Sequence, residues 1–467
     1  MSNTTSRSGE GQASTQYTSG TGSRTSSWRV FLVLFAVAFA YTSYTGHVWE
    51  DYLITYRASK NLATGNGLVF NPGEHVHSFT SPLGVLLPAV ASLLTGNSSD
   101  TAALWIFRLM SMSAYAGAGV LLWRLMRGLF SHAYPAVFLM LLLATDAKSV
   151  DNATNGMESA FVLLFMAWNL WALLRSPARR AVHLGLAWAG LMWSRPDSFI
   201  YIGASAGAVL LFGQFADGWT GRRRLIIDCM VGGLITTAVY GPWFVWAWWY
   251  YGSPVPHTII AKGVWTQPVT LKNVVKWVLH FPLDVLKESS TLGTTFTPTY
   301  AMNTGWPAFT IRVSGALSLV AMAMWLVPRA RWEARVTSFV FTIAHFYLTY
   351  FANFPAPWYL PIVTMLAFFT LSVVLAQLAE WLARRRVDAS AEAPVRPHRG
   401  VAVASLLLPL WGLGLMLPAA WELHHRQRIV EDGNRRLIGE YLRDNSQSPR
   451  DTAVFECLGY IGYYSNL

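Results

Sequence analysis

The stretch Trp28–Gly67, WRVFLVLFAVAFAYTSYTGHVWEDYLITYRASKNLATGNG, joins a long apolar run directly to a charged segment. The run Trp28–Tyr44 has the length and apolar character of a transmembrane helix. The stretch therefore predicts a membrane protein whose polar groups gather at one membrane edge. Both signs of charge follow the run, in the segment Trp49–Gly67: Glu50, Asp51, Arg57 and Lys60.

The composition of the whole chain supports the same class of protein. Of the 467 residues, 53% are apolar and only 13% are charged, which is about half of the roughly 25% charged residues in soluble proteins. Further apolar runs of membrane-spanning length follow the first, so we expect an all-α polytopic membrane protein. Residues 1–27 are polar and rich in Ser, Thr and Gly. They predict a disordered cytoplasmic tail, and no cleavable signal peptide is evident.

The net charge of +11 comes from short basic clusters between the apolar runs, which is typical of cytoplasmic loops. Because the basic residues form no single stripe, this charge does not indicate binding to nucleic acid. The clusters are Arg124/Arg127, Arg175/Arg179/Arg180, Arg222–Arg224, Arg329/Arg331/Arg335, and Arg384–Arg386 with Arg396/Arg399.

Placing every basic cluster in the cytoplasm predicts about eleven transmembrane helices, with the N-terminus inside and the C-terminus outside. The chain then divides into a transmembrane domain (28–421), with large outer loops at 47–101 and 250–308, and an outer C-terminal segment (422–467). The predicted spans are 28–46, 102–123, 134–150, 159–175, 182–196, 198–215, 225–249, 309–327, 336–353, 357–381 and 400–420.

Two apolar stretches are unusually short. Ser81–Leu94, interrupted by two prolines, is too short to cross a hydrocarbon core of about 30 Å at about 1.5 Å per residue. It predicts a helix lying at the membrane surface, beside the charged helix that begins at Glu50. The two spans within 181–215 are also short, so the outer turn between them, at Arg195–Asp197, is expected to lie in a recess.

Ionisable groups of both signs converge on the outer face, whereas the inner face is almost purely cationic. Such groups are costly at membrane depth and are therefore functional candidates. The pattern fits a reaction on a phosphate-bearing lipid, in which cations hold the departing phosphate and a carboxylate takes the proton of an attacking hydroxyl. The candidates are Glu50, Asp51, Arg57, Lys60, Glu74, His75, His77, Glu158, Arg195, Asp197, His257 and Lys262.

These residues also have structural interpretations. Glu50 and Asp51 suit the dipole at the start of a helix. Arg195 and its neighbour Asp197 fit a turn with a local ion pair, and Glu158 fits a helix cap.

The histidines and tryptophans of the outer segments also have both functional and structural interpretations. His75 and His77 could face one metal ion, but the spacing fixes no third ligand, so no metal site is predicted. Most tryptophans suit the membrane interface. Three near the outer turns are candidates for stacking on a sugar: Trp49, Trp265 and Trp358.

Four segments, in this order, resemble the GT-C glycosyltransferases, and most closely the polyprenyl-phosphate-dependent terminal arabinofuranosyltransferases and their Gram-negative relatives. The first and last are specific, and the middle two are weak alone but correctly placed. Together they extend the resemblance over roughly residues 28–380. The segments are WEDYLITYRASKNLATGNGLVFNPGEHVHSFTSPLGVLL (Trp49–Leu87), NGMES (Asn155–Ser159), SRPDS (Ser194–Ser198) and YYGSPVPHTIIAK (Tyr250–Lys262).

The resemblance implies a GT-C membrane core and a polyprenyl-phosphate-linked sugar donor in the outer leaflet. The acid that ends the family's first helix matches Asp51, which is favoured, or Glu50, and would be the catalytic base. Neither a nucleotide cofactor nor an obligatory metal is implied. Other matches to recurrent family groups are the cations Arg57, Arg195 and Lys262 and the acid Glu158.

The chain departs from the family pattern at two places. His75 and His77 stand where family members often have Arg and Glu, which removes a charge pair and introduces groups that titrate near neutral pH. The final segment DTAVFECLGYIGYYSNL predicts a small α/β periplasmic segment, with a strand at Thr452–Leu458, that is reduced or truncated relative to the family.

The predicted function is transfer of a sugar, expected to be a pentofuranose such as arabinofuranose, from a polyprenyl-phosphate donor to a periplasmic acceptor in cell-envelope glycan or glycoprotein synthesis at a bacterial inner membrane. A transporter or flippase of a lipid-linked sugar is the alternative. It would need polar groups at the bilayer midplane or internal repeats, and the sequence shows neither. An O-antigen ligase or polymerase shares the donor type but not the motifs. The acceptor, whether glycan, glycolipid or glycoprotein, and the stereochemical outcome stay open.

Overall fold

The computed structural model describes residues 22–263, 269–287, 291–299, 305–352, 356–384, 399–448 and 458–467. This part of the chain is helical and contains no strand. Its first ten elements are α1 (Gly22–Thr45), α2 (Glu50–Ala63), α3 (Pro82–Leu94), α4 (Asp100–Leu129), α5 (Tyr134–Thr145), α6 (Ala147–Asn152), α7 (Ser159–Arg175), α8 (Arg180–Ser194), the 3-10 turn η1 (Pro196–Ser198) and α9 (Phe199–Phe212).

The second half of the chain continues the bundle and ends in a long bent helix. Two of its short elements, η4 and η5, are π-helical, and η2 and η3 are 3-10 turns. Its elements are α10 (Trp219–Tyr251), α11 (His257–Gly263), α12 (Leu271–Asp284), α13 (Ala308–Ala323), η2 (Met324–Leu326), α14 (Trp332–Tyr350), η3 (Pro357–Tyr359), α15 (Leu360–Arg384), α16 (Arg399–Ser405), α17 (Leu407–Arg426), η4 (Gln427–Arg435), α18 (Arg436–Asn445), η5 (Leu458–Gly462) and α19 (Tyr463–Ser465).

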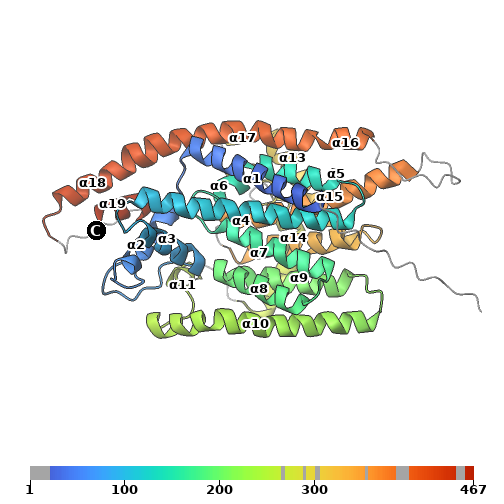
Figure 1. The fold of residues 1–467 in the computed structure, drawn as a ribbon, viewed down its shortest axis with the longest axis horizontal. Coiled ribbons are helices and arrows are strands. Elements are labelled where there is room, and N and C mark those ends of the chain that lie inside the picture. Colours follow the sequence, from blue (N-terminus) through green and yellow to red (C-terminus); the bar gives the residue numbers. More distant parts are fainter. Residues whose placement is uncertain are drawn as a thin grey trace, which may run out of the picture.

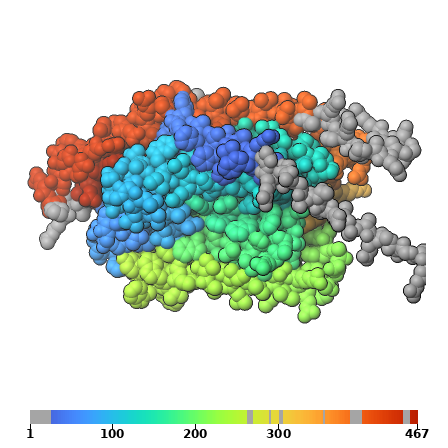
Figure 2. Space-filling model, viewed as in Figure 1, coloured from blue at the N-terminus to red at the C-terminus, as the bar shows by residue number. Residues whose placement is uncertain are grey.

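The long helices lie side by side along one axis (Figure 1). Helix α4 packs between α1 and α7, and α8 packs on α10. Helices α10 and α17 form opposite edges of the molecule (Figure 2). Large apolar side chains on α10 are exposed, including Leu234 at 71% and Trp249 at 80%. Such a surface suits lipid rather than water.

The two ends of the bundle differ in chemistry. One end carries α2, α3, α18 and α19 (Figure 1, left). Basic clusters meet at the other end, where Arg175 Nη1 donates to Gly128 O over 2.6 Å and the Arg331 guanidinium lies 4.6 Å from the Phe130 ring centre. The sequence predicts basic clusters on one face of the membrane and charges of both signs on the other. In the structure, these two groups lie at opposite ends of the bundle.

The predicted spans coincide with helices, with two differences. The span predicted at 134–150 is interrupted at Asp146, whose carboxylate accepts a hydrogen bond from Ser149 N and begins the separate helix α6. Helix α1 begins at Gly22, inside the tail predicted to be disordered. Its first turns pack on α4, where Trp123 Nε1 donates to Ser26 Oγ. Residues 1–21 lie outside the described part of the chain.

Six helical stretches of the described chain are long and apolar enough to cross a membrane: Ser26–Thr45, Asp100–Leu129, Trp219–Tyr251, Ala308–Leu326, Pro357–Arg384 and Val403–Asn445. Shorter apolar helices accompany them, among them Ser159–Arg175 and Pro196–Phe212. The chain is therefore a multi-pass membrane protein, and the number of eleven spans stays a prediction. As expected, the loop 47–101 holds two short helices, α2 and α3.

The C-terminal segment is helical where it is described. Helix α17 continues without a break through η4 into α18, so residues 422–445 extend a membrane helix. The α/β character predicted for this segment is not confirmed. Its expected strand at Thr452–Leu458 lies outside the described residues except for Leu458, which begins η5. Residues 458–467 pack on α2.

Candidate functional site

A cavity of about 980 Å³ opens beside the start of α2. Two of its sides differ in chemistry. Phe199 and Ile200 of α9 and Tyr240 and Phe244 of α10 form an apolar side. Polar groups from the first turn of α2, from the last residue of α17 and from η4 form the other side. These polar lining residues are Glu50, Asp51, Arg426, Glu431 and Arg435. Helices α10 and α17 lie at opposite edges of the bundle (Figure 1).

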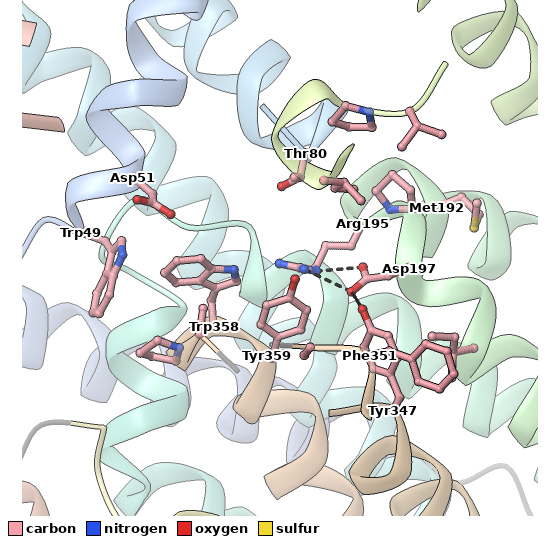
Figure 3. Close-up of a pocket in the computed structure, with 18 of the residues that line it drawn as sticks. Trp49, Asp51, Thr80, Met192, Arg195, Asp197, Tyr347, Phe351, Trp358 and Tyr359 are labelled. Atoms are coloured by element: carbon pink, nitrogen blue, oxygen red, sulfur yellow. Dashed lines mark hydrogen bonds and ion pairs between the residues drawn. The ribbon is translucent and has the colours of Figure 1, made fainter. Parts of the chain in front are cut away.

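The two adjacent carboxylates of α2 have different surroundings. Glu50 is held by the C-terminal segment, because Gly459 N–H donates to its Oε1 over 3.1 Å and Arg435 Nη1 lies 3.4 Å from its Oε2. Asp51 instead points toward the open space between Trp358 and Thr80 (Figure 3).

Arg195 faces the same space from the other side (Figure 3). Its Nη1 donates to Glu158 over 3.0 Å, and its Nε and Nη2 donate to the two oxygens of Asp197 over 3.0 and 3.1 Å. The guanidinium lies 4.0 Å from the Tyr359 ring centre. Tyr347 OH adds a hydrogen bond of 3.1 Å to Asp197. The guanidinium is thus held by two carboxylates and by the Tyr359 side chain.

Glu158 reaches Arg195 because of a glycine turn. Gly156 has a φ of +100°, and an added Cβ would lie 2.5 Å from the Tyr52 ring. Only glycine suits this combination of backbone conformation and close contact. The turn brings Glu158 to the start of α7, where its side chain makes no capping bond and instead pairs with Arg195 while 4% exposed. Glu158 thus occupies the N-cap position of α7 without a side-chain capping bond, and the local ion pair expected at Arg195 is present and extends to Glu158.

Arg57, which the sequence placed among the substrate cations, does not line the cavity. It is 8% exposed and donates to four acceptors at 2.9 to 3.1 Å. The guanidinium also lies 4.4 Å from the Phe70 ring centre. Arg57 thus joins the first outer loop to the last residues of the chain. The four acceptors are Phe70 O, Asn71 Oδ1, Gly462 O and Leu467 O.

Lys60 also lies outside the cavity lining. It forms an ion pair with Asp100, with Nζ 2.8 Å from Oδ1. Tyr56 and Tyr463 donate to the same carboxylate over 3.1 and 2.6 Å. This cluster links α2 to α4 and α19.

The remaining candidates of the first loop are likewise not brought into the cavity. Glu74 is exposed and accepts a hydrogen bond from Asn71, and the His75 ring is tilted by 35° against the Tyr250 ring, with centroids 4.3 Å apart. His77 and His257 hold the loop to the end of α10. His77 N–H donates to His257 Nδ1, and His257 N–H donates to His77 O, each over 3.0 Å. These two hydrogen bonds join His257 to the loop segment in which His75 and His77 replace the usual residues of the family.

His77 is 2% exposed and stacks on Tyr251 with a centroid separation of 4.4 Å. Burial and the neighbouring His257 lower the pKa of His77 to about 4. The side chain of Lys262 lies outside the described residues, as does Trp265.

Tryptophans proposed to stack on a sugar do line the cavity. The rings of Trp49 and Trp358 meet edge to face with centroids 5.4 Å apart. Tyr347 and Tyr359 also line the cavity and were not predicted from the sequence. Tyr359 stands in the aromatic-rich segment NFPAPWYLP, which offered a signal for it. Nor were the three charged residues of the C-terminal helix predicted, for which no local signal exists: Arg426, Glu431 and Arg435.

No cluster of three or more His, Cys, Asp or Glu side chains with the geometry of a metal site occurs among the described residues. The expectation that no metal is obligatory stays a prediction.

Comparisons with curated proteins identify two relatives with the same name. The terminal β-(1→2)-arabinofuranosyltransferase of Mycobacterium tuberculosis is 28% identical over 258 residues, which covers 50% of this chain and 38% of that protein. Its namesake from Corynebacterium glutamicum is 28% identical over 236 residues, covering 46% of this chain and 33% of that protein. The matched region thus spans less than two fifths of the relatives. No family model matches the chain.

Solved structures of low sequence identity share the fold. ArnT from Cupriavidus metallidurans, bound to undecaprenyl phosphate, has a TM-score of 0.58 at 13% identity, covering 96% of this chain and 85% of ArnT. The oligosaccharyltransferase AglB from Archaeoglobus fulgidus, in complex with an inhibitory peptide and a dolichol-phosphate, has a TM-score of 0.54 at 14% identity, covering 95% and 60%. The recognition made from four motifs is confirmed: the curated homologues are terminal arabinofuranosyltransferases, and the fold is that of GT-C glycosyltransferases.

Proposed function

We propose that this chain is a membrane glycosyltransferase that moves a pentofuranose, such as arabinofuranose, from a polyprenyl-phosphate donor to a hydroxyl-bearing acceptor. The observation that carries the proposal is the cavity, in which Asp51 and Arg195 face one space between an apolar and a polar side. The names of the curated relatives support the sugar, and both fold neighbours carry a polyprenyl or dolichyl phosphate.

The donor suits the apolar side of the cavity. Its polyprenyl chain would lie against Phe199, Tyr240 and Phe244, and its phosphate would lie at Arg195. That guanidinium is held by Glu158 and Asp197 and lines the cavity, where it would meet the phosphate oxygens. A fixed cation in a low-dielectric site stabilises the charge that develops on the leaving phosphate.

Asp51 is the proposed general base. The acceptor oxygen forms a bond to the anomeric carbon, and the bond from that carbon to the phosphate oxygen breaks with its electron pair. The hydroxyl proton passes to the Asp51 carboxylate. Asp51 is preferred to Glu50 because it matches the acid of the family motif, and Gly459 N–H and Arg435 join the Glu50 carboxylate to the C-terminal segment. No cofactor takes part in the proposed reaction.

The proposed orientation puts the cavity on the periplasmic side of a bacterial inner membrane and the N-terminus in the cytoplasm. It is supported by the basic clusters at the end of the bundle far from α2, since such clusters favour the cytoplasm. The acceptor is then a periplasmic glycan, glycolipid or glycoprotein. The alternative, a flippase of a lipid-linked sugar, finds no support in the names of the relatives reported above.

The test is transfer by the purified protein from synthetic polyprenyl-phospho-arabinofuranose to an oligo-arabinofuranoside. We expect Asp51→Asn to lower kcat by at least about 100-fold, the usual size of a general-base contribution, and Glu50→Gln to lower it far less. Equal rates for wild type and Asp51→Asn would refute the assigned base. If the wild-type protein moves the intact donor between leaflets without transferring sugar, the proposal that it is a glycosyltransferase is refuted.

A further inference from the structure

Helix α12, between α11 and α13, is a separate short helix to which neither the motifs nor the comparisons assign a role. Its 14 residues, at about 1.5 Å each, cannot cross a hydrocarbon core of about 30 Å. Thr270 begins the helix, because its Oγ1 accepts a hydrogen bond from Asn273 N–H over 3.2 Å. Helix α12 is therefore a surface helix of the bundle and not one of its spans.

One side of α12 packs against the end of α14, next to the cavity. The buried Trp277 ring stacks on Tyr350 with centroids 5.6 Å apart and meets Phe351 edge to face at 5.3 Å. Tyr350 OH donates to Asp284 Oδ2 over 2.6 Å. Tyr350 and Phe351 line the cavity (Figure 3), as does Val269, two residues before α12. The helix is thus fixed beside the cavity.

A second side of α12 is apolar and exposed. Leu271 is 82% exposed and Leu279 is 72% exposed. Residues three, four, seven or eight positions apart share one side of a helix, so the exposed apolar residues form a single stripe. An exposed stripe of this kind suits lipid acyl chains rather than water. The stripe consists of Leu271, Val275, Val278, Leu279 and Leu283.

Cationic side chains lie beside the apolar stripe. Lys272 and Lys276 are one helical turn apart, and both are exposed. Within the described ranges, the ion pair of this segment joins Lys287 to Asp284 and includes neither of these lysines. Exposed cations at the edge of an apolar stripe are typical of helices in a membrane interface, where the cations meet headgroup phosphates.

We propose that α12 is a membrane-surface helix that binds anionic phospholipid, with headgroup phosphates at Lys272 and Lys276 and acyl chains against the apolar stripe. A water-soluble anionic acceptor at the same lysines would leave the stripe exposed to water, so the lipid is the better fit. Because Trp277 and Asp284 hold Tyr350, the contact with lipid ties one part of the cavity wall to the bilayer.

The test is photo-cross-linking of the purified full chain in nanodiscs of phosphatidylcholine mixed with phosphatidylglycerol. A diazirine is placed on the acyl chain of one lipid and then of the other, and mass spectrometry gives the yield on residues 269–287. The exposed apolar part of α10, residues 230–249, contains no cation and serves as the internal reference. Relative to it, we expect α12 to favour phosphatidylglycerol about tenfold, the effect of two lysines near an anionic surface.

Lys272→Gln/Lys276→Gln should bring the yields of the two lipids on α12 to similar values, with the melting temperature unchanged because both lysines are exposed. The matched control is Arg222→Gln/Arg223→Gln. It removes the same charge from exposed residues in the first turns of α10 and should leave the lipid preference of α12 at its wild-type value.

Equal yields of the two lipids on α12 of the wild type would overturn the inference, and so would a preference that the lysine variant retains. A lysine variant with the wild-type lipid preference but a raised KM for a phosphorylated oligo-arabinofuranoside would assign the lysines to an anionic acceptor instead. Cross-linking requires no sugar transfer. A wild-type protein that binds phosphatidylglycerol at α12 but transfers no sugar therefore supports this inference and refutes only the proposed function.

Discussion

The sequence and the structure give Arg57 different roles. The family resemblance makes it a substrate cation, whereas the structure buries it against the end of the chain, with four acceptors and the Phe70 ring around its guanidinium. In Arg57→Lys the charge is retained, but a single ammonium reaches only one or two of these acceptors.

The expected loss follows from the hydrogen bonds that the lysine does not make. Two missing bonds, at about 1–1.5 kcal/mol each, lower the free energy of unfolding by about 2–3 kcal/mol. The loss should concentrate in residues 458–467, because Gly462 O and Leu467 O are two of the four acceptors. We expect a melting temperature several degrees lower and faster proteolytic cleavage near the C-terminus.

The assay combines thermal unfolding, limited proteolysis and donor kinetics on the purified protein. Arg443→Lys is the matched control, because Arg443 is exposed and bonds only to the neighbouring Asp444 among the pairs described for it. The structural reasoning would be refuted by an Arg57→Lys protein that melts like wild type but has a donor KM raised tenfold or more. That result would restore Arg57 as a phosphate ligand.

Three further outcomes are expected. Arg195→Lys should raise the donor KM and lower kcat by about 100-fold or more in steady-state kinetics, because the fork that binds Asp197 and faces the cavity is lost; an unchanged donor KM would remove Arg195 from the phosphate site. Gly156→Ala should lower the melting temperature and the activity together, since a Cβ at a φ of +100° meets the Tyr52 ring; wild-type behaviour in both would contradict the turn. Because the pKa of His77 is about 4 when folded and about 6.5 when unfolded, the unfolded chain binds more protons between these values. Stability should therefore fall by up to about 3 kcal/mol as the pH drops from 6.5 to 4, and His77→Phe should flatten that part of the stability–pH curve; an equally steep curve in the variant would assign the effect to other groups.

Much of the architecture was predictable because the signals are local. Apolar runs of membrane length, the serine and proline that begin α3, and the charged start of α2 each act over a few residues. The recess at Arg195 followed from the shortness of the helices on either side, and the cavity there confirms it. The break at Asp146 was missed although Thr145, Asp146 and Lys148 are a local polar signal within the expected span.

Side-chain roles at the site depended on distant parts of the chain. The contacts of Glu50 could not be predicted from charge type or family position, because they come from Arg435 and Gly459, which lie 385 and 409 residues along the chain. In the same way, Arg57 is removed from the cavity by carbonyl groups at the end of the chain.

The sequence by itself determined the membrane helices, the concentration of polar groups at one end and the GT-C resemblance, since hydrophobicity and charge are properties of each segment. Only the tertiary structure decided which of those polar groups share a cavity. A side chain's hydrogen-bond partners are set by which helices pack together, and that packing places His47 against Asp151 and Arg195 against Glu158.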